Sequence, residues 1–393
     1  MREQRMQFLP DLRLSTQGTQ RTGRYFNQEE ARISTETSQA LNAGVSSSVT
    51  LFEGFGRMAS LRETRFANAA SQSELERARQ TVVFTVTSNF LALIEQQEQL
   101  RVRREDLAAQ QAQEALIRDF VEAGSRPISD LYQQQATVAN ARLALVQAER
   151  ARELAKVDLI QTLQLDPFGS YEFQAPALGE AALPAAPDSL AALLRQAFEQ
   201  RADLAAGQAR LSAAEQGVRA ARSNLWPTLS LSAGYNSSYS STVDFGLWDQ
   251  FDQRRGGSLG LSISVPIFDR FSTQTATERA RVQRENVRID LQNLRQEVAL
   301  QVRRAALDYR AAQEQLRAAE AQREAAQLAL QAARERYEVG AATLVELSQA
   351  RAAQVQAASD LVSARYGLVF QERLMAYYLG ELDPDEAARA GGL

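Results

Sequence analysis

The sequence contains neither cysteine nor histidine. A chain without these residues has no disulfides, no thiol nucleophile, no Ser-His-Asp triad and no metal site built from His or Cys ligands. Its acidic residues lie along helical faces beside arginine, where a solvated surface is a better explanation than paired catalytic carboxylates. We therefore expect no enzyme activity, no cofactor and no metal site.

Long apolar runs are missing too. No stretch of the 393 residues is apolar for as long as a transmembrane helix requires, and residues 1–10 lack the apolar segment of a signal peptide. The formal net charge of −4 gives no electrostatic reason to expect nucleic-acid binding. Taken alone, these absences favour a cytoplasmic protein, but an internal repeat argues against that interpretation.

Proline and glycine are absent from about Asp269 to Tyr337, which as one helix would be about 100 Å long. The apolar residues follow the alternating four-and-three spacing of a coiled-coil seam. This seam consists of Val298, Val302, Ala305, Tyr309, Ala312, Leu316, Ala319, Arg323, Ala326, Leu330, Ala333 and Tyr337. A second register on an adjacent face consists of Leu307, Ala311, Glu314, Ala318, Ala321, Ala325, Leu328 and Ala332. Two seams suit a sheet or tube of helices, although a two-stranded coiled coil or a spectrin-like bundle explains this stretch equally well.

The two halves of the chain are copies of one unit. With a shift of about 216 residues, landmarks of the first half coincide with landmarks of the second half. The aligned pairs include Leu9-Pro10 with Trp226-Pro227, Gly124 with Gly340, and Leu165-Asp166-Pro167 with Leu382-Asp383-Pro384. We therefore expect the same order of elements in each half.

Each unit is predicted to contain a strand, a loop, a second strand, a long helix, a turn and a second helix, which makes the fold mixed α and β. The elements expected in the first unit are residues 7–17, 44–52, 56–122 and 127–165. Those expected in the second unit are residues 229–240, 258–268, 269–337 and 343–379. Gly124 and Gly340 stand where a helix must stop and reverse, a position for a residue that tolerates positive φ.

The domain boundaries follow from this repeat. We expect a first repeat over 1–167, a linker over 168–187, a second repeat over 188–384 and a polar tail over 385–393. An amphipathic helical stretch, Ser189 to Ser223, has no counterpart in the first half. By symmetry we expect about 30 further residues, and any targeting signal, ahead of Met1.

The predicted strands alternate between apolar and small polar residues. In the last strand one face is Leu259, Leu261, Ile263, Val265 and Ile267, and the other face is serine, glycine and proline. Aromatic residues lie near both strand ends: Tyr235, Tyr239, Phe245, Trp248 and Phe251 at one end, and Trp226, Phe268 and Phe271 at the other. This pattern fits a transmembrane β-barrel with a polar lumen and two aromatic girdles, while a sheet with one solvated face is the alternative.

One chain supplies too few strands to close a barrel by itself. Open sheet edges cannot lie in lipid, because their backbone groups would remain unpaired. Three chains would contribute about twelve strands, enough for a water-filled pore. The long helices would then extend from the same ring as a tube.

With these features the chain resembles the TolC family of Gram-negative outer-membrane channel proteins, over its whole length. The residues that carry the resemblance are both strand pairs and the two turn segments, 121–131 and 337–347. The resemblance implies a homotrimer with a shared twelve-stranded barrel in the outer membrane and a helical barrel in the periplasm. It also implies a periplasmic adaptor (membrane fusion protein) and an inner-membrane pump as partners.

The resemblance assigns roles to the two turns, which lie at the constricted tip of such a duct. By position, Ser129, Asp130, Tyr337 and Glu346 correspond to the network that closes the aperture, and Gly124, Leu131, Gly340 and Leu347 correspond to the grooves that receive the adaptor. Ala342 and Gln349 depart from the family pattern, so the lock is either weaker here or completed by Arg126. For Asp130 and Glu346 the alternative is helix capping, and for the glycines it is plain hairpin geometry.

The resulting expectation is a passive exit duct of a tripartite efflux pump that conducts small molecules. A type I protein secretion channel is the alternative within the family. Two alternatives of other classes are a periplasmic adaptor and a structural coiled-coil protein. The adaptor class predicts one hairpin between split lipoyl halves, which this sequence lacks, and the coiled-coil class leaves the alternating strands unexplained.

Overall fold

The computed structural model describes residues 1–27, 31–174 and 189–382. It divides into two compact units, the first made of 1–73 with 205–293 and the second of 74–204 with 294–393. Each sequence repeat therefore contributes to both units. Most of the expected linker, the last two residues of the expected second repeat and the whole polar tail lie outside the described residues.

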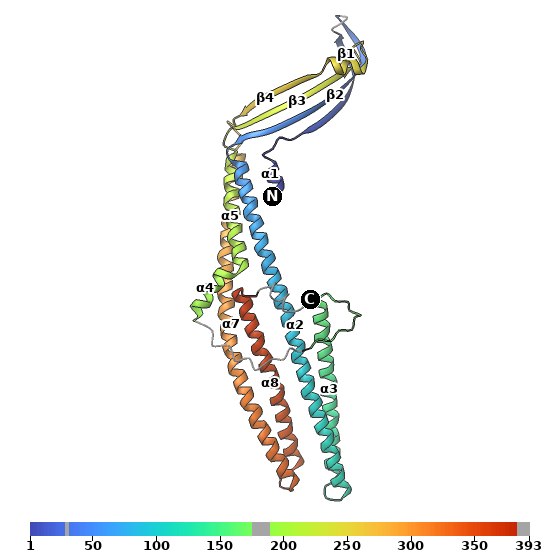
Figure 1. The fold of residues 1–393 in the computed structure, drawn as a ribbon, viewed down its shortest axis with the longest axis vertical. Coiled ribbons are helices and arrows are strands. Elements are labelled where there is room, and N and C mark those ends of the chain that lie inside the picture. Colours follow the sequence, from blue (N-terminus) through green and yellow to red (C-terminus); the bar gives the residue numbers. More distant parts are fainter. Residues whose placement is uncertain (28–30, 175–188, 383–393) are drawn as a thin grey trace. The chain divides into compact units, whose positions relative to one another are not determined.

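The first unit contains a sheet of four antiparallel strands in the order β1-β2-β3-β4 (Figure 1). The strands are β1 Arg13–Asn27, β2 Arg32–Glu53, β3 Thr228–Ser240 and β4 Gly256–Ser264. The central pair, β2 with β3, joins the first repeat to the second. Both repeats thus build a single sheet.

The register places the apolar residues of neighbouring strands on one face. Leu231 pairs with Val49 on one side and with Leu261 on the other. One residue further along β3, Ser232 pairs with Ser48 and Gly260. Because directly paired residues of antiparallel strands project to the same side, the predicted alternation is continuous across β2, β3 and β4.

The strand boundaries differ from those predicted. Residues 7–12 do not belong to β1, which instead continues to Asn27, and β2 begins at Arg32 instead of Gly44. These extensions are rich in Gln, Thr and Arg, so they carry no apolar alternation. Backbone pairing defines them, between β1 and β2 throughout and also with β3 at residues 40–43. Strand β4 ends at Ser264, ahead of Pro266, which has no N–H to donate to a ladder.

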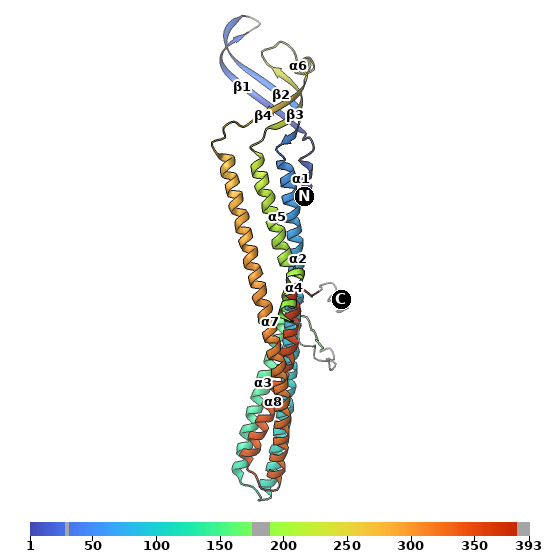
Figure 2. The same cartoon turned by 90° about the vertical axis from the view of Figure 1, so that its left-hand side faces the viewer.

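Two short helices of this unit have no counterpart in the sequence prediction. Helix α1 spans Arg2–Met6, within and ahead of the expected first strand, and helix α6 spans Leu247–Gln253 between β3 and β4 (Figure 2). Both are shorter than two helical turns, so no apolar periodicity is readable in their sequences.

The links from strand to long helix repeat the same geometry in both halves. Phe55 and Phe271 both have positive φ, at 63° and 61°. Phe55 packs edge-on against Phe52 with ring centroids 5.5 Å apart, and Phe271 does so against Phe268 at 6.1 Å. The sequence repeat is therefore a structural repeat down to single rings.

The second unit is built from long helices. Its elements are α3 Ile128–Thr162, α4 Leu190–Gln200, α8 Leu344–Leu379 and the greater parts of α2 Gly56–Glu122 and α7 Ser272–Glu338. Helices α2 and α3 form one hairpin, and α7 and α8 form the other. Helix α7 begins at Ser272 and not at Asp269, because Asp269 instead accepts a hydrogen bond from the Thr273 N–H, with its oxygen 2.8 Å from that nitrogen.

The predicted seam of α7 is confirmed except around Arg323, which is exposed. Val298, Val302 and Tyr309 are buried, and the seam stays buried through Ala319 and again at Tyr337. The second register is uncovered in this single chain: Leu307 is 58% exposed and Leu328 is 61% exposed. In the first hairpin Leu93 and Leu100 of α2 are buried.

The expected helical stretch 189–223 is broken into α4 and α5 Ala202–Ser223. The break is at Arg201, whose backbone is extended, with φ −68° and ψ 119°. No glycine or proline marks this position. The Arg201 side chain instead donates hydrogen bonds to Asp203 and to Gln301 of α7, and these contacts explain its extended backbone. No helix of the described residues is both long and apolar enough to cross a membrane.

Candidate functional site

Both hairpin tips are closed by the same hydrogen-bonded turn. The Gly124 N–H donates to the Val121 carbonyl (3.0 Å) and the Ser125 N–H donates to the Phe120 carbonyl (2.9 Å). At the second tip Gly340 donates to Tyr337 and Ala341 donates to Arg336, at 3.0 and 2.8 Å. This is the Schellman arrangement, which requires positive φ at the residue after the helix. Gly124 and Gly340 have φ of 70° and 79°, so their hairpin role is observed.

An apolar cluster joins the two tips. Its buried members are Ile117, Tyr337, Ala342, Leu344 and Leu347. Val121, Leu131, Leu330 and Ala333 are partly buried against it. Leu131 and Leu347, the two leucines predicted to form docking grooves, therefore lie in one cluster that holds the first hairpin against the second.

Arg126 makes a polar contact across this cluster. Its guanidinium lies over the Tyr337 ring, 4.5 Å from the ring centroid, and its Nη2 donates to the Tyr337 carbonyl oxygen at 3.1 Å. Ala342, where some family members have a basic residue, is buried beside Tyr337. The contact supports the prediction that Arg126 supplies the positive charge at the tip.

Tyr337 is 1% exposed, and its hydroxyl has no hydrogen-bond partner within the described part of the chain. Burial raises the pKa of this hydroxyl, the positive charge of Arg126 opposes the rise, and the negative charge of Asp130 adds to it. Asp130 is thus close enough to Tyr337 to act on it, from the first turn of α3. Ser129, the residue before it, is exposed.

Thr343 caps the start of α8, and Glu346 lies in the first turn of this helix. The Thr343 hydroxyl oxygen accepts from the Glu346 N–H at 3.2 Å and donates to the Glu346 carboxylate at 3.4 Å. The same carboxylate forms an ion pair with Arg336 at 3.4 Å, with both side chains about half exposed. A capped helix start that includes Glu346 is therefore observed, while the role of Glu346 in closing an aperture stays a prediction.

A cavity of about 390 Å³ lies between the two hairpins, next to the apolar cluster. Its lining includes Gln110, Gln134, Leu330 and Leu344. The buried Gln134 side chain donates to the Gln110 backbone carbonyl at 3.0 Å and to the Gln110 side-chain oxygen at 2.9 Å. The hairpins are therefore less tightly packed here than at the cluster itself. No acidic cluster in the described ranges is arranged to hold a metal ion.

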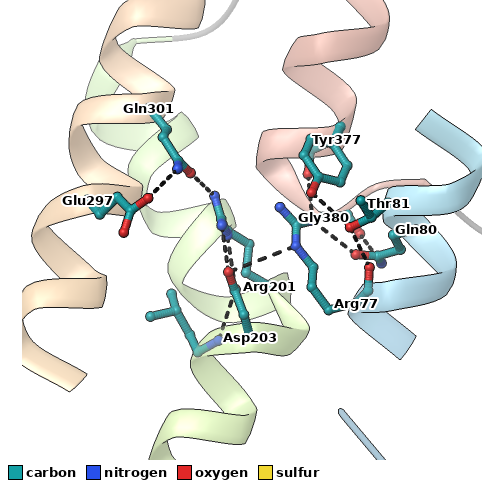
Figure 3. A network of polar contacts seen from close by, with 10 residues as sticks. Arg77, Gln80, Thr81, Arg201, Asp203, Glu297, Gln301, Tyr377 and Gly380 are labelled. Atoms are coloured by element: carbon teal, nitrogen blue, oxygen red, sulfur yellow. Dashed lines mark hydrogen bonds and ion pairs between the residues drawn. The ribbon is translucent and has the colours of Figure 1, made fainter. Parts of the chain in front are cut away.

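A buried polar network holds the opposite end of the second unit (Figure 3). Arg201, with a side chain 3% exposed, donates to both Asp203 oxygens at 3.0 and 2.6 Å and to Gln301 of α7 at 2.8 Å. Arg77 of α2 lies 3.8 Å from the Asp203 carboxylate, donates to the Tyr377 carbonyl at 3.0 Å and stacks over the Tyr377 ring. These contacts tie α2, α5, α7 and α8 together.

The network perturbs the ionisation of its members. Burial alone would raise the pKa of Asp203, but the hydrogen bond and charge of Arg201, together with the charge of Arg77, hold it below its usual value. Burial and the neighbouring charge of Arg201 lower the pKa of Arg77. No sequence pattern marks this network, because its residues come from separate helices and follow no local spacing.

The sequence was compared with known families and structures. Residues 1–163 and 193–381 match the family described as "Outer membrane efflux protein". The chain belongs to this family. Membership confirms the resemblance to TolC-type channels and the location in the Gram-negative outer membrane, with the helical part in the periplasm. The family is not enzymatic, in agreement with the expectation that the chain is not an enzyme.

Two family members illustrate the degree of similarity. The chain is 24% identical over 269 residues to "Pyoverdine export outer membrane protein OpmQ" of Pseudomonas aeruginosa, covering 66% of this chain and 53% of OpmQ. It is 30% identical over 251 residues to "Protein CyaE" of Bordetella pertussis, covering 60% of this chain and 49% of CyaE. The chain spans about half the length of the curated relatives it matches.

The fold is that of solved channels in the family. The crystal structure of the outer membrane protein VceC from Vibrio cholerae matches with a TM-score of 0.82 and 18% identity, over 96% of this chain and 89% of VceC. At this identity the likeness shows the fold alone, and it confirms the mixed α and β fold with a duplicated strand-strand-long helix unit.

Proposed function

We propose that this chain forms the outer-membrane exit duct of a tripartite efflux system and conducts small molecules passively. Three copies share one transmembrane barrel of about twelve strands, and their helices continue it as a periplasmic tube. The partners in this proposal are two further copies of the chain, a periplasmic adaptor, an inner-membrane pump and the lipid of the outer membrane. Family membership excludes the adaptor class and the structural coiled-coil class.

The observation that carries the proposal is the open, two-faced sheet. Strands β1 and β4 each pair on one side only within the described sheet, and β4 is exposed along its whole length. Such edges have unpaired backbone groups, which further strands can satisfy. Leu259 is 77% exposed on the apolar face, where a lipid environment makes this exposure favourable.

The helices support the same assembly. The uncovered second register of α7, from Leu307 to Leu328, has the spacing of a helix-packing seam. Neighbouring chains in a ring would cover it and would pair the sheet edges at the same time. One trimer thus accounts for two independent unsatisfied surfaces.

In this proposal the two hairpin tips control the passage of solute through the duct. Ser129, Asp130, Tyr337 and Glu346 belong to the aperture in this proposal, with Arg126 as the basic partner of Tyr337. The docking surfaces for the adaptor are the turns around the exposed Gly124 and Gly340, which Leu131 and Leu347 support from within the apolar cluster. In support of docking, a side-chain carbon added at either glycine would meet no atom within 4 Å, so the tips are open to a partner.

Small molecules are the favoured cargo, with protein secretion as the alternative. OpmQ is named for the export of pyoverdine, a cargo of the small-molecule class. The pump determines the choice of cargo in such a system, and a passive duct only has to accommodate it. A small solute is therefore the cargo that this chain would accommodate most easily.

The native mass in detergent tests the assembly. The protein is extracted from an outer-membrane fraction and analysed by light scattering corrected for detergent. About three chains per particle are expected, because four strands per chain close a barrel at that number. A monomer or dimer that needs no detergent would contradict the shared barrel.

Conductance tests the aperture. Asp130→Asn and Glu346→Gln together remove two charges, and Gln at position 346 keeps a side chain that can still reach back in a capping box. We expect a higher single-channel conductance in planar bilayers. Unchanged conductance would leave Asp130 and Glu346 with their capping role alone.

A further inference from the structure

Three apolar side chains stand exposed at the loop between β3 and β4. Trp248 is 82% exposed, Phe245 is 57% exposed and Leu247 is 37% exposed. Together they form what we call the α6 patch. Asp249 and Asp252 lie on the same short helix, and Asp252 pairs with Arg255 at 3.0 Å. Tryptophan is enriched where a membrane protein meets the boundary between lipid and water.

Helix α6 is fixed in place by one buried side chain. Gln250 is 1% exposed, and its side chain accepts from the Ser240 N–H at 2.9 Å and donates to the Ser240 and Phe245 carbonyls at 3.0 and 2.7 Å. Trp248 precedes Gln250 by two residues, or about 200° of helix rotation. Gln250 therefore faces the end of β3 and Trp248 faces away from it.

The helix lies on the apolar side of the sheet. The Ser237 hydroxyl donates to the Phe251 carbonyl oxygen at 2.7 Å. Ser237 shares its strand face with Tyr235, Ala233 and Leu231, because alternate residues of a strand project to the same side. This is the face on which Leu231 pairs with Val49 and Leu261. Figure 2 shows α6 beside the end of β3.

The position of α6 along β3 matches the edge of the apolar layer of a lipid bilayer. From Leu229, at the start of β3, to Ser237 the strand advances by about 27 Å. With the tilt of about 40° that is usual for membrane barrels, this is about 20 Å across the bilayer, against an apolar band about 25 Å tall. A helix packed at Ser237 therefore lies where hydrocarbon gives way to headgroups.

We propose that α6 is an interfacial anchor, and that the α6 patch inserts Trp248, Phe245 and Leu247 into the headgroup region of the lipid bilayer around the barrel. This inference rests on the proposed function, because it requires the apolar face of the sheet to contact lipid. The buried Gln250 makes the anchor a rigid part of the sheet, so it also sets how deeply the strands sit in the membrane.

The chain's two tryptophans make the test direct. Trp226→Phe leaves Trp248 as the single tryptophan, which is then reconstituted in vesicles that contain lipids brominated either near the glycerol end or near the methyl end of the acyl chain. Two matched controls carry one tryptophan in the Trp226→Phe, Trp248→Phe background: Leu261→Trp on the apolar face, and Ser262→Trp on the opposite face of the same strand. Acrylamide reports exposure to water.

The expected result is a loss of about half of the Trp248 emission with bromine near the glycerol end and a smaller loss with bromine near the methyl end. Leu261→Trp is expected to be quenched most by the deep bromine, and Ser262→Trp only by acrylamide. If brominated lipid quenches Leu261→Trp but only acrylamide quenches Trp248, the proposed anchoring by α6 is refuted, while the proposed lipid-facing barrel is not contradicted. If brominated lipid leaves Leu261→Trp unquenched, the sheet does not face lipid and the proposed function fails with the anchor.

Discussion

Replacing Arg126 by glutamine is expected to loosen the two hairpin tips. The change removes the hydrogen bond from Arg126 to the Tyr337 carbonyl (3.1 Å) and the stacking of the guanidinium over the Tyr337 ring. A hydrogen bond from a charged donor contributes about 1.5 kcal/mol. The cation–π contact contributes about 1 kcal/mol at a partly exposed site.

Because Arg126 is only half-buried, we take the combined effect as about 2 kcal/mol per chain, after a reduction for exposure to water. That corresponds to about a 30-fold shift of the equilibrium between paired and separated tips. In a planar bilayer the variant is therefore expected to spend a larger fraction of time in a state of higher conductance. The apolar cluster is left intact, so thermal stability is expected to fall by only a few degrees.

Arg126→Lys is the matched control. Lysine keeps the positive charge but has no planar group to stack flat on Tyr337 and no fork of donors, so an intermediate effect is expected. Equal conductance for the native protein and the glutamine variant would refute the assigned role of Arg126. A glutamine variant that unfolds at a much lower temperature would show instead that Arg126 holds the hairpin together and does not gate it.

Three further predictions concern the turns and the polar network. Gly340→Ala is expected to destabilise the chain by about 1 kcal/mol, because φ is 79° there, while Gly367→Ala inside α8 is expected to stabilise it by about 0.5 to 1 kcal/mol; thermal unfolding compares the two. The pKa of Asp203 is lower in the folded chain than in the unfolded chain. Its contribution to the free energy of unfolding is therefore complete above the usual pKa of 3.8 and is lost as the pH falls through the folded pKa. Asp203→Asn is expected to lower the free energy of unfolding by about 3 kcal/mol at pH 7 and to abolish this pH dependence in acid unfolding curves. Tryptophan at Ser125 together with Ala341 is expected to abolish adaptor binding in a pull-down at unchanged native mass, and intact binding would count against docking at the tips.

The helical half of the fold was predictable from sequence because its pattern is long and local. Gly56–Glu122 was predicted with its observed bounds, and α8 was predicted to within one residue at its start. A seam of many turns repeats the same spacing often enough to fix the buried face, as Val298 and Val302 show. The glycine turns were readable for a similar reason, since a left-handed residue has few alternatives to glycine.

The strands and the polar network were less predictable. The distal parts of β1 and β2 are rich in Gln, Thr and Arg, so no apolar alternation marks them, and backbone pairing makes them strands. The break at Arg201 has no local signal either, because it depends on Asp203 and on Gln301, which lies 100 residues further along the chain.

The sequence by itself determined the duplication, the helix lengths, the buried seams, the two-faced strands and the glycine turns, because each is a property of neighbouring or regularly spaced residues. Tertiary structure alone decided that both repeats share one sheet, that Arg126 lies on the Tyr337 ring, and that α6 lies on the apolar face beside Ser237. Each of these three facts depends on a contact between residues that no regular spacing relates, so a spacing pattern contains no information about it.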